Sequence, residues 1–454
     1  MTELLDRSAR FIDTGVIDGV DNPTTVSINE LADNIAMVDA FSHVVLFDTG
    51  DGLVAFDTSN PWAAKHAVEA VRQWRPDPFR ALVYTHGHID HIGGAKAFLD
   101  EADASGATRP AVVSHEGVPA RFARYDLTSG YNAIINARQF GGSALTDGDG
   151  GLKVGRFGLN WVQPSTTFDE KMSMKVGGLT IELRHGLGET DDHAWAWIPE
   201  HKAACIGDFI IWMFPNAGNP QKVQRYPREW AMVLREIATF EPELLLPAHG
   251  LPVAGKARIA GFLDDYASAL EYLVDATIGM MNEGARLDDI IHTVRLPADL
   301  AVKPWLAPNY DEPEFVVRNI WRRYGGWYDG NPARLKPPPD SAVAREVAAL
   351  AGGVGPLALR AQELSDAGDH RLACHLAELA VQADPDDLEA HRIRAGIYSA
   401  RRRTETSLMA KGIYGWASGE SKRRVAALDP GALDTAPDPT SDHAPAYTPG
   451  SGDG

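Results

Sequence analysis

The residues best suited to chemistry stand in one short segment, Thr85-His86-Gly87-His88-Ile89-Asp90-His91. His86 and His88 are two positions apart and can point the same way, while Asp90 and His91 follow about one turn later. Imidazole and carboxylate ligands grouped in this way favour zinc. The alternative is a solvated, histidine-rich loop, and it is disfavoured because further residues of the same types occur downstream.

The elements around this segment are expected to place it at the end of a strand. Residues 81–84 are apolar and predict a short strand, and Gly93-Gly94 is followed by a helical pattern from Ala95 to Leu99. Loops that leave strand ends are where α/β folds carry their chemistry. The metal-binding types therefore stand in a position typical of a site.

Three more candidate ligands flank later apolar strands. His193 comes just before the predicted strand 194–198, and Asp208 follows the strand 203–206. His249 follows the strand 244–247. One such residue alone would be a weak signal, but their recurrence at strand ends predicts one shared site.

Together these residues predict a site for two Zn²⁺ ions per subunit. We expect one ion to be held by His86, His88 and His193, and the other by Asp90, His91 and His249, with Asp208 bridging. Two cations that share a water lower its pKa from roughly 15.7 toward about 7, which supplies hydroxide at neutral pH. Asp90 and Asp208 are the carboxylates expected to act in catalysis. Asp57 is the candidate partner that fixes the tautomer of a ligating imidazole, and this role is favoured over that of a turn aspartate.

Cationic and amide side chains offer candidates for binding an anionic substrate. Asn132 and Arg138 share helical spacing and could line an oxyanion pocket, with a plain polar helix face as the alternative. Lys222 and Arg225 are the further candidates for substrate binding.

The composition bounds the class of protein. The chain has 454 residues, of which 44% are hydrophobic, so a globular protein with two domains is expected. The net charge of -19 argues against a nucleic-acid partner, and an anionic substrate must be drawn in by local cations. Cys205 and Cys374 are the only cysteines, so no disulfide framework is expected. Without a signal-peptide pattern or a membrane-spanning apolar run, we expect a cytoplasmic protein that does not insert into membranes.

The remaining pattern gives a coarse order of elements. Residues 1 to about 35 read as a polar lead-in, and hairpins are expected at 44–56 and 174–183. From residue 266 the pattern is helical, and 369–383 with 388–401 resembles one tetratricopeptide-like pair. We therefore expect three parts: 1–265, a helical domain over 266–427, and a disordered tail over 428–454 that is rich in Asp, Pro, Ser and Gly.

The motif Thr-His-x-His-x-Asp-His, followed by separate His, Asp and His residues at strand ends, resembles the signature of the metallo-β-lactamase fold. The resemblance covers about residues 30–265. It implies an α/β architecture, a four-layer αββα sandwich, with a dinuclear site at one edge. Members of the superfamily catalyse many different reactions, so the fold alone does not indicate which reaction to expect.

The helical half looks like the dimerisation domain of the alkyl sulfatases of that superfamily. The segment Gly326-Trp327-Tyr328-Asp329-Gly330-Asn331-Pro332 and the helices after it carry this similarity. It implies a homodimer and a zinc-dependent hydrolase in which a metal-bridging hydroxide cleaves sulfate esters of alkyl alcohols. The substrate would be a small, anionic, amphiphilic molecule. A lactonase, thioesterase or other ester hydrolase on the same dinuclear site is the alternative, and a diiron oxygen enzyme or a non-catalytic binder is less favoured.

The chain departs from the alkyl sulfatase pattern in one region. Those enzymes carry glutamates in the stretch that corresponds to 188–193 and a Glu-Asn-Thr segment at 207–209, whereas the ligands expected here are His193 and Asp208. The general acid stays unassigned, and the candidates are Glu189, Asp192, His185 and His115.

Overall fold

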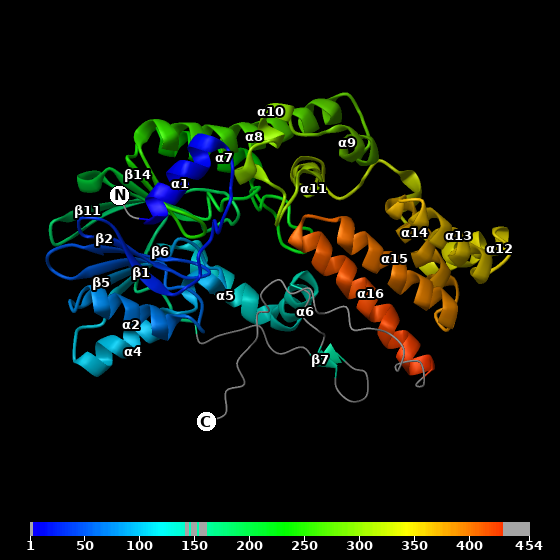
Figure 1. Ribbon diagram of the computed structural model, residues 1–454, viewed down its shortest axis with the longest axis horizontal. Coiled ribbons are helices and arrows are strands. Elements are labelled where there is room, and N and C mark those ends of the chain that lie inside the picture. Colours follow the sequence, from blue (N-terminus) through cyan, green and yellow to red (C-terminus); the bar gives the residue numbers. More distant parts are fainter. Residues whose placement is uncertain (1–2, 141–144, 147–151, 154–160, 430–454) are drawn as a thin grey trace. The chain divides into compact units, whose positions relative to one another are not determined.

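The structure is a computed structural model that describes residues 3–140, 145–146, 152–153 and 161–429 (Figure 1). It contains two compact units. The first runs to Lys336 and includes residues 406–410, and the second contains Pro337–Glu405 and the chain from Lys411 onward. Most of the tail predicted over 428–454 lies outside the described residues.

Two sheets form the centre of the first unit. The first sheet has seven strands, and its neighbours pair antiparallel from β1 to β4 and parallel from β4 onward. In order across the sheet they are β1 (Ser27–Ala32), β2 (Ile35–Asp39), β3 (Val44–Asp48), β4 (Leu53–Phe56), β5 (Phe79–Val83), β6 (Ala111–His115) and β9 (Thr166–Phe168). The predicted hairpin at 44–56 is β3 and β4.

The second sheet has six strands, of which only β13 and β14 pair in parallel. In order they are β10 (Lys171–Val176), β11 (Leu179–His185), β12 (Ala194–Ile198), β13 (Ala203–Gly207), β14 (Leu244–Pro247) and β15 (Val253–Ala254). The predicted hairpin at 174–183 is β10 and β11. A separate two-stranded sheet joins β7 (Leu145–Thr146) to β8 (Leu152–Lys153).

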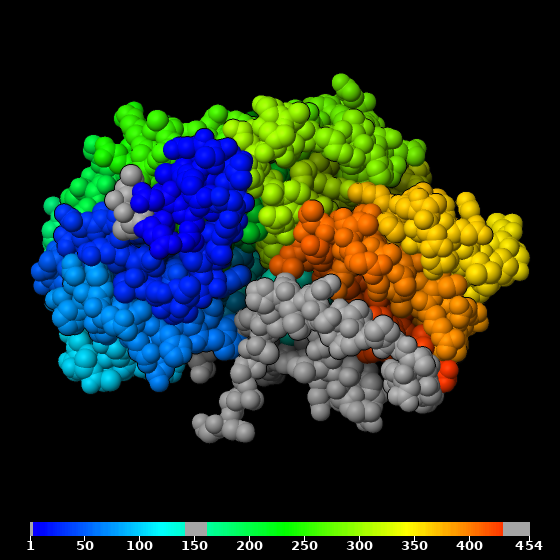
Figure 2. Space-filling model, in the orientation of Figure 1, coloured from blue at the N-terminus to red at the C-terminus, as the bar shows by residue number. Residues whose placement is uncertain are grey.

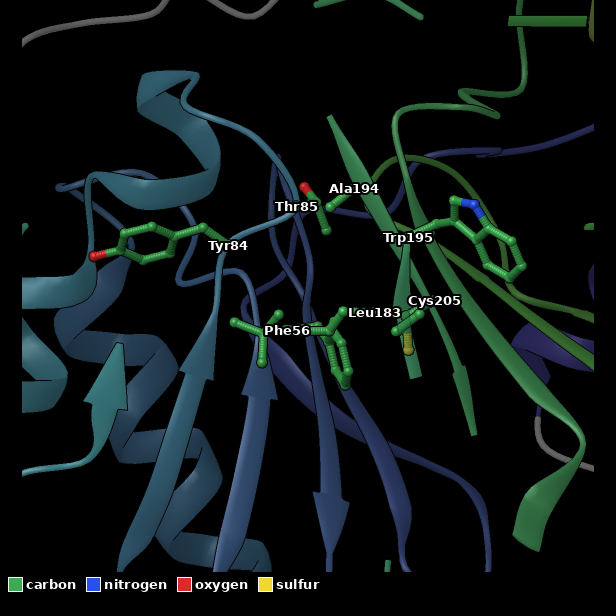
Figure 3. A pocket seen from close by; sticks show the side chains of 9 residues that line it. Phe56, Tyr84, Thr85, Leu183, Ala194, Trp195 and Cys205 are labelled. Atoms are coloured by element: carbon green, nitrogen blue, oxygen red, sulfur yellow. The ribbon is translucent and has the colours of Figure 1, made fainter. Parts of the chain in front are cut away.

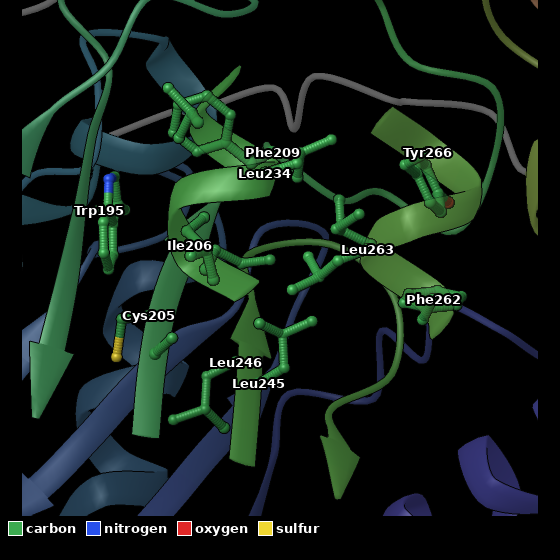
Figure 4. Packing of buried hydrophobic residues seen from close by; sticks show 14 of the residues in the cluster. Trp195, Cys205, Ile206, Phe209, Leu234, Leu245, Leu246, Phe262, Leu263 and Tyr266 are labelled. Carbon is green, nitrogen blue, oxygen red and sulfur yellow. The ribbon is translucent and has the colours of Figure 1, made fainter. Parts of the chain in front are cut away.

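The expected four-layer sandwich is confirmed by how the strands alternate. On β5, Ala81 and Val83 face the core shared with the second sheet, while Leu82 points to the outer core under α2 (Ala64–Trp74) and α4 (Ala95–Ser105). The second sheet is covered in turn by α7 (Pro227–Thr239) and α8 (Lys256–Asn282), whose Leu234 and Leu263 lie close to its strands (Figure 4).

The two sheets meet directly beneath the candidate site. Phe56 from β4 and Leu183 and Cys205 from the second sheet lie between them, and Tyr84 points away toward the outer face (Figure 3). Thr85 stands at the edge of this contact, so the histidine-rich segment that follows it leaves from the rim of the sandwich.

The N-terminal residues differ from the predicted polar lead-in. Residues Glu3–Thr14 form α1, which buries Leu4, Leu5 and Phe11. Phe11 meets Trp212 edge-on, with 6.3 Å between the ring centroids. These apolar positions make a narrow helical stripe within a polar stretch, which is why the composition concealed it. The N-terminal residues, dark blue in Figure 2, form part of the surface of the first unit.

Further helices complete the first unit. They are α3 (Ile89–Ile92), α5 (Gly117–Leu127), α6 (Ser129–Gln139), α9 (Leu287–Thr293), α10 (Ala298–Ala301) and α11 (Pro313–Gly325), with 3-10 turns η1 (Pro199–His201), η2 (Pro304–Leu306) and η3 (Pro332–Arg334). The domain boundary expected at 265/266 falls inside α8, and α9 to α11 belong to the first unit with it.

The second unit is helical. It is built from α12 (Asp340–Leu350), α13 (Val354–Asp366), α14 (His370–Ala383), α15 (Leu388–Thr404) and most of α16 (Leu408–Leu428). The predicted pair at 369–383 and 388–401 is α14 and α15, and the side chains of Asp369 and Asp387 cap their first turns. No single helix among the described residues is long and apolar enough to cross a membrane, although α12 and α13 together, bent by 89°, have the length and composition to do so.

Candidate metal centre

A buried aspartate fixes the backbone from which the histidine-rich segment starts. Asp57, which follows β4, accepts hydrogen bonds from the backbone N–H of Thr85 and from its hydroxyl, both at 2.8 Å. Its other contact is Nδ1 of His91, also at 2.8 Å. Asp57 therefore lies where the sequence suggests, between the loop and one of the candidate ligands.

The first group of candidate ligands contains His86, His88, Glu189 and Asp208, whose ligand atoms all lie within 4.8 Å of one another. His86 Nε2 is 2.8 Å from His88 Nδ1 and 3.9 Å from Asp208 Oδ2. Glu189 Oε1 lies 3.7 Å from His88 Nδ1.

The second group contains Asp90, His91 and His249, again with ligand atoms within 4.8 Å. Asp90 Oδ2 lies 3.5 Å from His91 Nε2 and 3.3 Å from His249 Nε2. Asp208 reaches this group as well, with Oδ2 at 3.4 Å from His91 Nε2 and Oδ1 at 3.6 Å from His249 Nε2. Asp208 thus stands between both groups, the position expected of a bridging carboxylate.

Two polar atoms at the centre of the site make no hydrogen bond among the described residues. They are His91 Nε2 and Asp208 Oδ1, and both are buried. With Nδ1 of His91 held by Asp57, Nε2 is directed at the site and offers a lone pair once its proton is lost. A buried imidazole and carboxylate with free lone pairs fit a divalent cation such as zinc.

The structure differs from the sequence prediction at His193. This imidazole stacks on His86, with 4.7 Å between the ring centroids, and its Nε2 accepts the backbone N–H of Asp208 at 3.1 Å. Nε2 of His193 is therefore engaged, while its Nδ1 has no hydrogen-bond partner among the described residues, and Glu189 is the residue that lies beside His88. The glutamates that alkyl sulfatases carry in this stretch were the one feature of the sequence that pointed to Glu189 as a ligand.

The charges of the metal-free site follow from burial and close contact. Burial, with the neighbouring His91, lowers the pKa of His86 well below its usual range. Burial opposes the charge of His91 too, but Asp208 and Asp90 outweigh it and raise the pKa. Burial raises the pKa of Glu189 to about 8, against the opposing effect of Arg225.

Two of the predicted substrate-binding cations lie beside Glu189 and its neighbours. Arg225 is only 2% exposed, lies 3.2 Å from Glu189 Oε1 and also donates to the carbonyl of Glu189. Lys222 donates to Asn136 Oδ1 at 2.8 Å. Burial and the charge of Arg225 lower the pKa of Lys222 to about 8, while Glu189 and Asp90 oppose this shift.

The other two predicted residues make different contacts. Arg138 donates to Gln221 Oε1 at 3.1 Å. Gln221 is the residue that precedes Lys222 in the chain. Asn132 donates to the carbonyl and hydroxyl of Thr128, which directly precedes α6. The amide of Asn132, which is buried, thus donates to the residue that caps its own helix.

The candidates for the general acid are largely held in structural contacts. Asp192 accepts from Arg121 Nε at 2.7 Å and from the backbone N–H of Gly87 at 3.2 Å, so it supports the histidine-rich loop. His115 and His185 stack on each other with 3.9 Å between centroids. Glu189 lies among the candidate metal ligands themselves, so none of the four is assigned as the general acid.

Comparison with known protein families covers most of the chain. Residues 38–249 match the metallo-beta-lactamase superfamily, and residues 286–424 match the alkyl sulfatase dimerisation domain. A linear primary-alkylsulfatase from Pseudomonas sp. is 28% identical over 364 residues, which are 77% of this chain and 68% of that protein. An (R)-specific secondary-alkylsulfatase from Pseudomonas sp. is also 28% identical, over 78% of this chain and 56% of its own length.

More distant relatives and solved structures agree. An alkyl/aryl-sulfatase of Saccharomyces cerevisiae is 23% identical over 87% of this chain and 64% of its own length. The solved structure of the stereoselective inverting sec-alkylsulfatase Pisa1 from Pseudomonas sp. matches with a TM-score of 0.77 and 25% identity, over 88% of this chain and 66% of that one.

The chain spans 56% to 68% of the length of these curated relatives. It shares with them both the sandwich that carries the histidine-rich loop and the helical domain that follows. The chain is therefore similar to the metallo-β-lactamase superfamily over residues 38–249, to the alkyl sulfatase dimerisation domain over residues 286–424, and to alkyl sulfatases over most of its length.

Proposed function

We propose that this protein is a zinc-dependent hydrolase that cleaves sulfate esters of alkyl alcohols. The observation that carries the proposal is the pair of histidine and carboxylate groups that meet at Asp208. The similarity to alkyl sulfatases over more than three quarters of the chain supports the choice of substrate.

The proposed centre holds two Zn²⁺ ions per subunit. His86, His88 and Glu189 would hold one, Asp90, His91 and His249 the other, and Asp208 would bridge them. When bound, such a pair supplies a water with a lowered pKa and a positive field for an anionic group.

The chain's own residues would bind and orient the sulfate ester. Lys222 and Arg225 carry positive charge beside Glu189 and are the groups proposed to bind the sulfate oxygens. Arg138, joined to Gln221, would add charge at the same loop. Arg225 and Asp208 are buried, so bulk water screens the charge of Arg225 only weakly.

A panel of matched substrates tests the choice of reaction. The zinc-loaded protein is given an alkyl sulfate, a lactone and a thioester of similar chain length, and kcat/KM is measured for each. The proposal expects the alkyl sulfate to be turned over fastest, with Asp90→Ala inactive on it. Faster turnover of the lactone or thioester would replace this function with a carboxylic ester hydrolase on the same centre.

We also propose that the protein is a homodimer formed through the second unit. The match to the alkyl sulfatase dimerisation domain supports this. Within the second unit Leu350 is 89% exposed and Leu359 58% exposed, so both side chains are available to a partner surface.

A further inference from the structure

We infer that the segment 22–43 positions His249, and with it the second metal site. The contacts are made by His43 and Asn22. Neither residue belongs to the ligand groups, and His43 is fully buried. The inference rests on the proposed metal centre but not on the reaction that this centre performs.

Hydrogen bonds from this segment hold the backbone on both sides of His249. The backbone N–H of His43 donates to the carbonyl of Ala248 at 2.7 Å. The imidazole of His43 contacts the carbonyl of Gly250 through Nε2, also at 2.7 Å. Asn22 Oδ1 accepts the backbone N–H of Gly250 at 2.7 Å. The residues before and after His249 are thus fixed by a segment more than 200 positions earlier in the chain.

The tautomer of His43 is set by the same geometry. The backbone N–H of Ala40 points at Nδ1 from 3.3 Å, so Nδ1 accepts and the ring proton is on Nε2. Nε2 then donates to Gly250, and both ring nitrogens are satisfied inside the core. Phe41, close by in the same segment, meets the ring of His249 edge-on at 5.1 Å and limits its rotation.

Other ligands of the two metal sites are held by other residues. Asp192 and Arg121 hold the backbone of Gly87 between His86 and His88. His91 is fixed by Asp57. Of the three ligands of the second site, His249 is therefore the one whose position depends on His43 and Asn22, so loss of these contacts should weaken one metal site and spare the other.

The test measures zinc binding by the full-length protein, without reference to turnover. The two Zn²⁺ dissociation constants are obtained by competition with a chelating dye for the parent, His43→Phe and His43→Gln. Phe keeps a ring in the core but removes both hydrogen bonds, whereas Gln retains one donor and one acceptor. We expect His43→Phe to bind one Zn²⁺ as the parent does and the other about 10- to 100-fold more weakly, with His43→Gln closer to the parent.

A matched control tests whether the effect is specific to His43, and a second variant tests the same support through Asn22. His391→Phe removes comparable contacts, to Ser421 and Pro385, from a histidine of the second unit, and both zinc constants should stay at parental values. If His43→Phe does not fold, Asn22→Ala removes the single contact to Gly250 from a half-buried position, and Asn22→Asp restores the acceptor.

Combination with His88→Ala assigns the weakened site. His88→Ala with His43→Phe should weaken the binding of both ions, because each change acts on a different site. The inference is overturned if His43→Phe and Asn22→Ala bind both ions as tightly as the parent, or if both constants rise equally. A parent that binds no Zn²⁺ would instead refute the proposed metal centre.

Discussion

Glu189 Oε1 lies 3.7 Å from Nδ1 of His88 and 3.2 Å from Nη1 of Arg225. This carboxylate thus joins a candidate metal ligand to a candidate sulfate-binding cation. Because His193 is turned to the backbone of Asp208, the geometry assigns the two residues opposite roles, which substitution can separate.

Glu189→Gln should weaken the first zinc site about 10-fold or more, because a neutral amide is a poorer ligand than a carboxylate. His193→Gln keeps an oxygen that can accept the N–H of Asp208 and should leave two zinc ions bound. Metal content after dialysis compares the two variants. Loss of zinc in His193→Gln but not in Glu189→Gln would restore His193 as the ligand.

Asp57→Asn should weaken the second zinc site about 10- to 100-fold, because the amide has one accepting oxygen for contacts that now use two. Zinc competition measures this. Asp39→Asn is the control, since Asp39 is a buried carboxylate that accepts from Ser27 and Thr25 rather than from Thr85 or a candidate ligand. Equal zinc affinities in the two variants would remove Asp57 from its supporting role.

The histidine-rich loop and Asp57 could be predicted from sequence because their ligand types are close together or end a recognisable strand. Glu189 and His193 could not be told apart, since they are four residues apart on one loop and the choice depends on which side chain meets the Asp208 backbone. The support from His43 and Asn22 joins residues more than 200 positions apart, and no local pattern signals it.

Fold class was predictable for a similar reason. Strands such as 53–56 and 244–247 are buried on both faces. They are therefore apolar throughout, and the turn residues on either side make these short apolar runs recognisable as strands. The helix α1 was missed because its few buried residues stand in a polar stretch. The expected end of the first domain fell inside α8, because helical pattern alone does not say which core a helix joins.

Gly218→Ala should lower the free energy of unfolding by about 1–3 kcal/mol. A Cβ there would lie 2.2 Å from the backbone nitrogen of Val316, and backbone cannot move aside as a side chain can. Gly279→Ala is the control, because its Cβ would meet nothing within 4 Å inside α8 and should stabilise the helix by about 0.5–1 kcal/mol. Chemical denaturation measures both, and an unchanged stability of Gly218→Ala would contradict the close approach.

Leu350→Glu combined with Leu359→Glu should convert the dimer to a monomer, because charges would enter an apolar interface. Light scattering after size-exclusion chromatography gives the mass. Leu127→Glu is the matched control, since Leu127 is 85% exposed in the first unit. A dimer that survives the double substitution would place the interface elsewhere in the second unit, and a monomeric parent would refute dimerisation itself.

The central claim is that two metal ions at this centre drive hydrolysis of an alkyl sulfate. The most direct measurement adds Zn²⁺ stepwise to metal-free protein and follows inorganic sulfate released from dodecyl sulfate, with Asp90→Ala in parallel. Our account predicts that full sulfate release needs the second equivalent and that Asp90→Ala releases none. No sulfate from a parent with both zinc ions bound would contradict it.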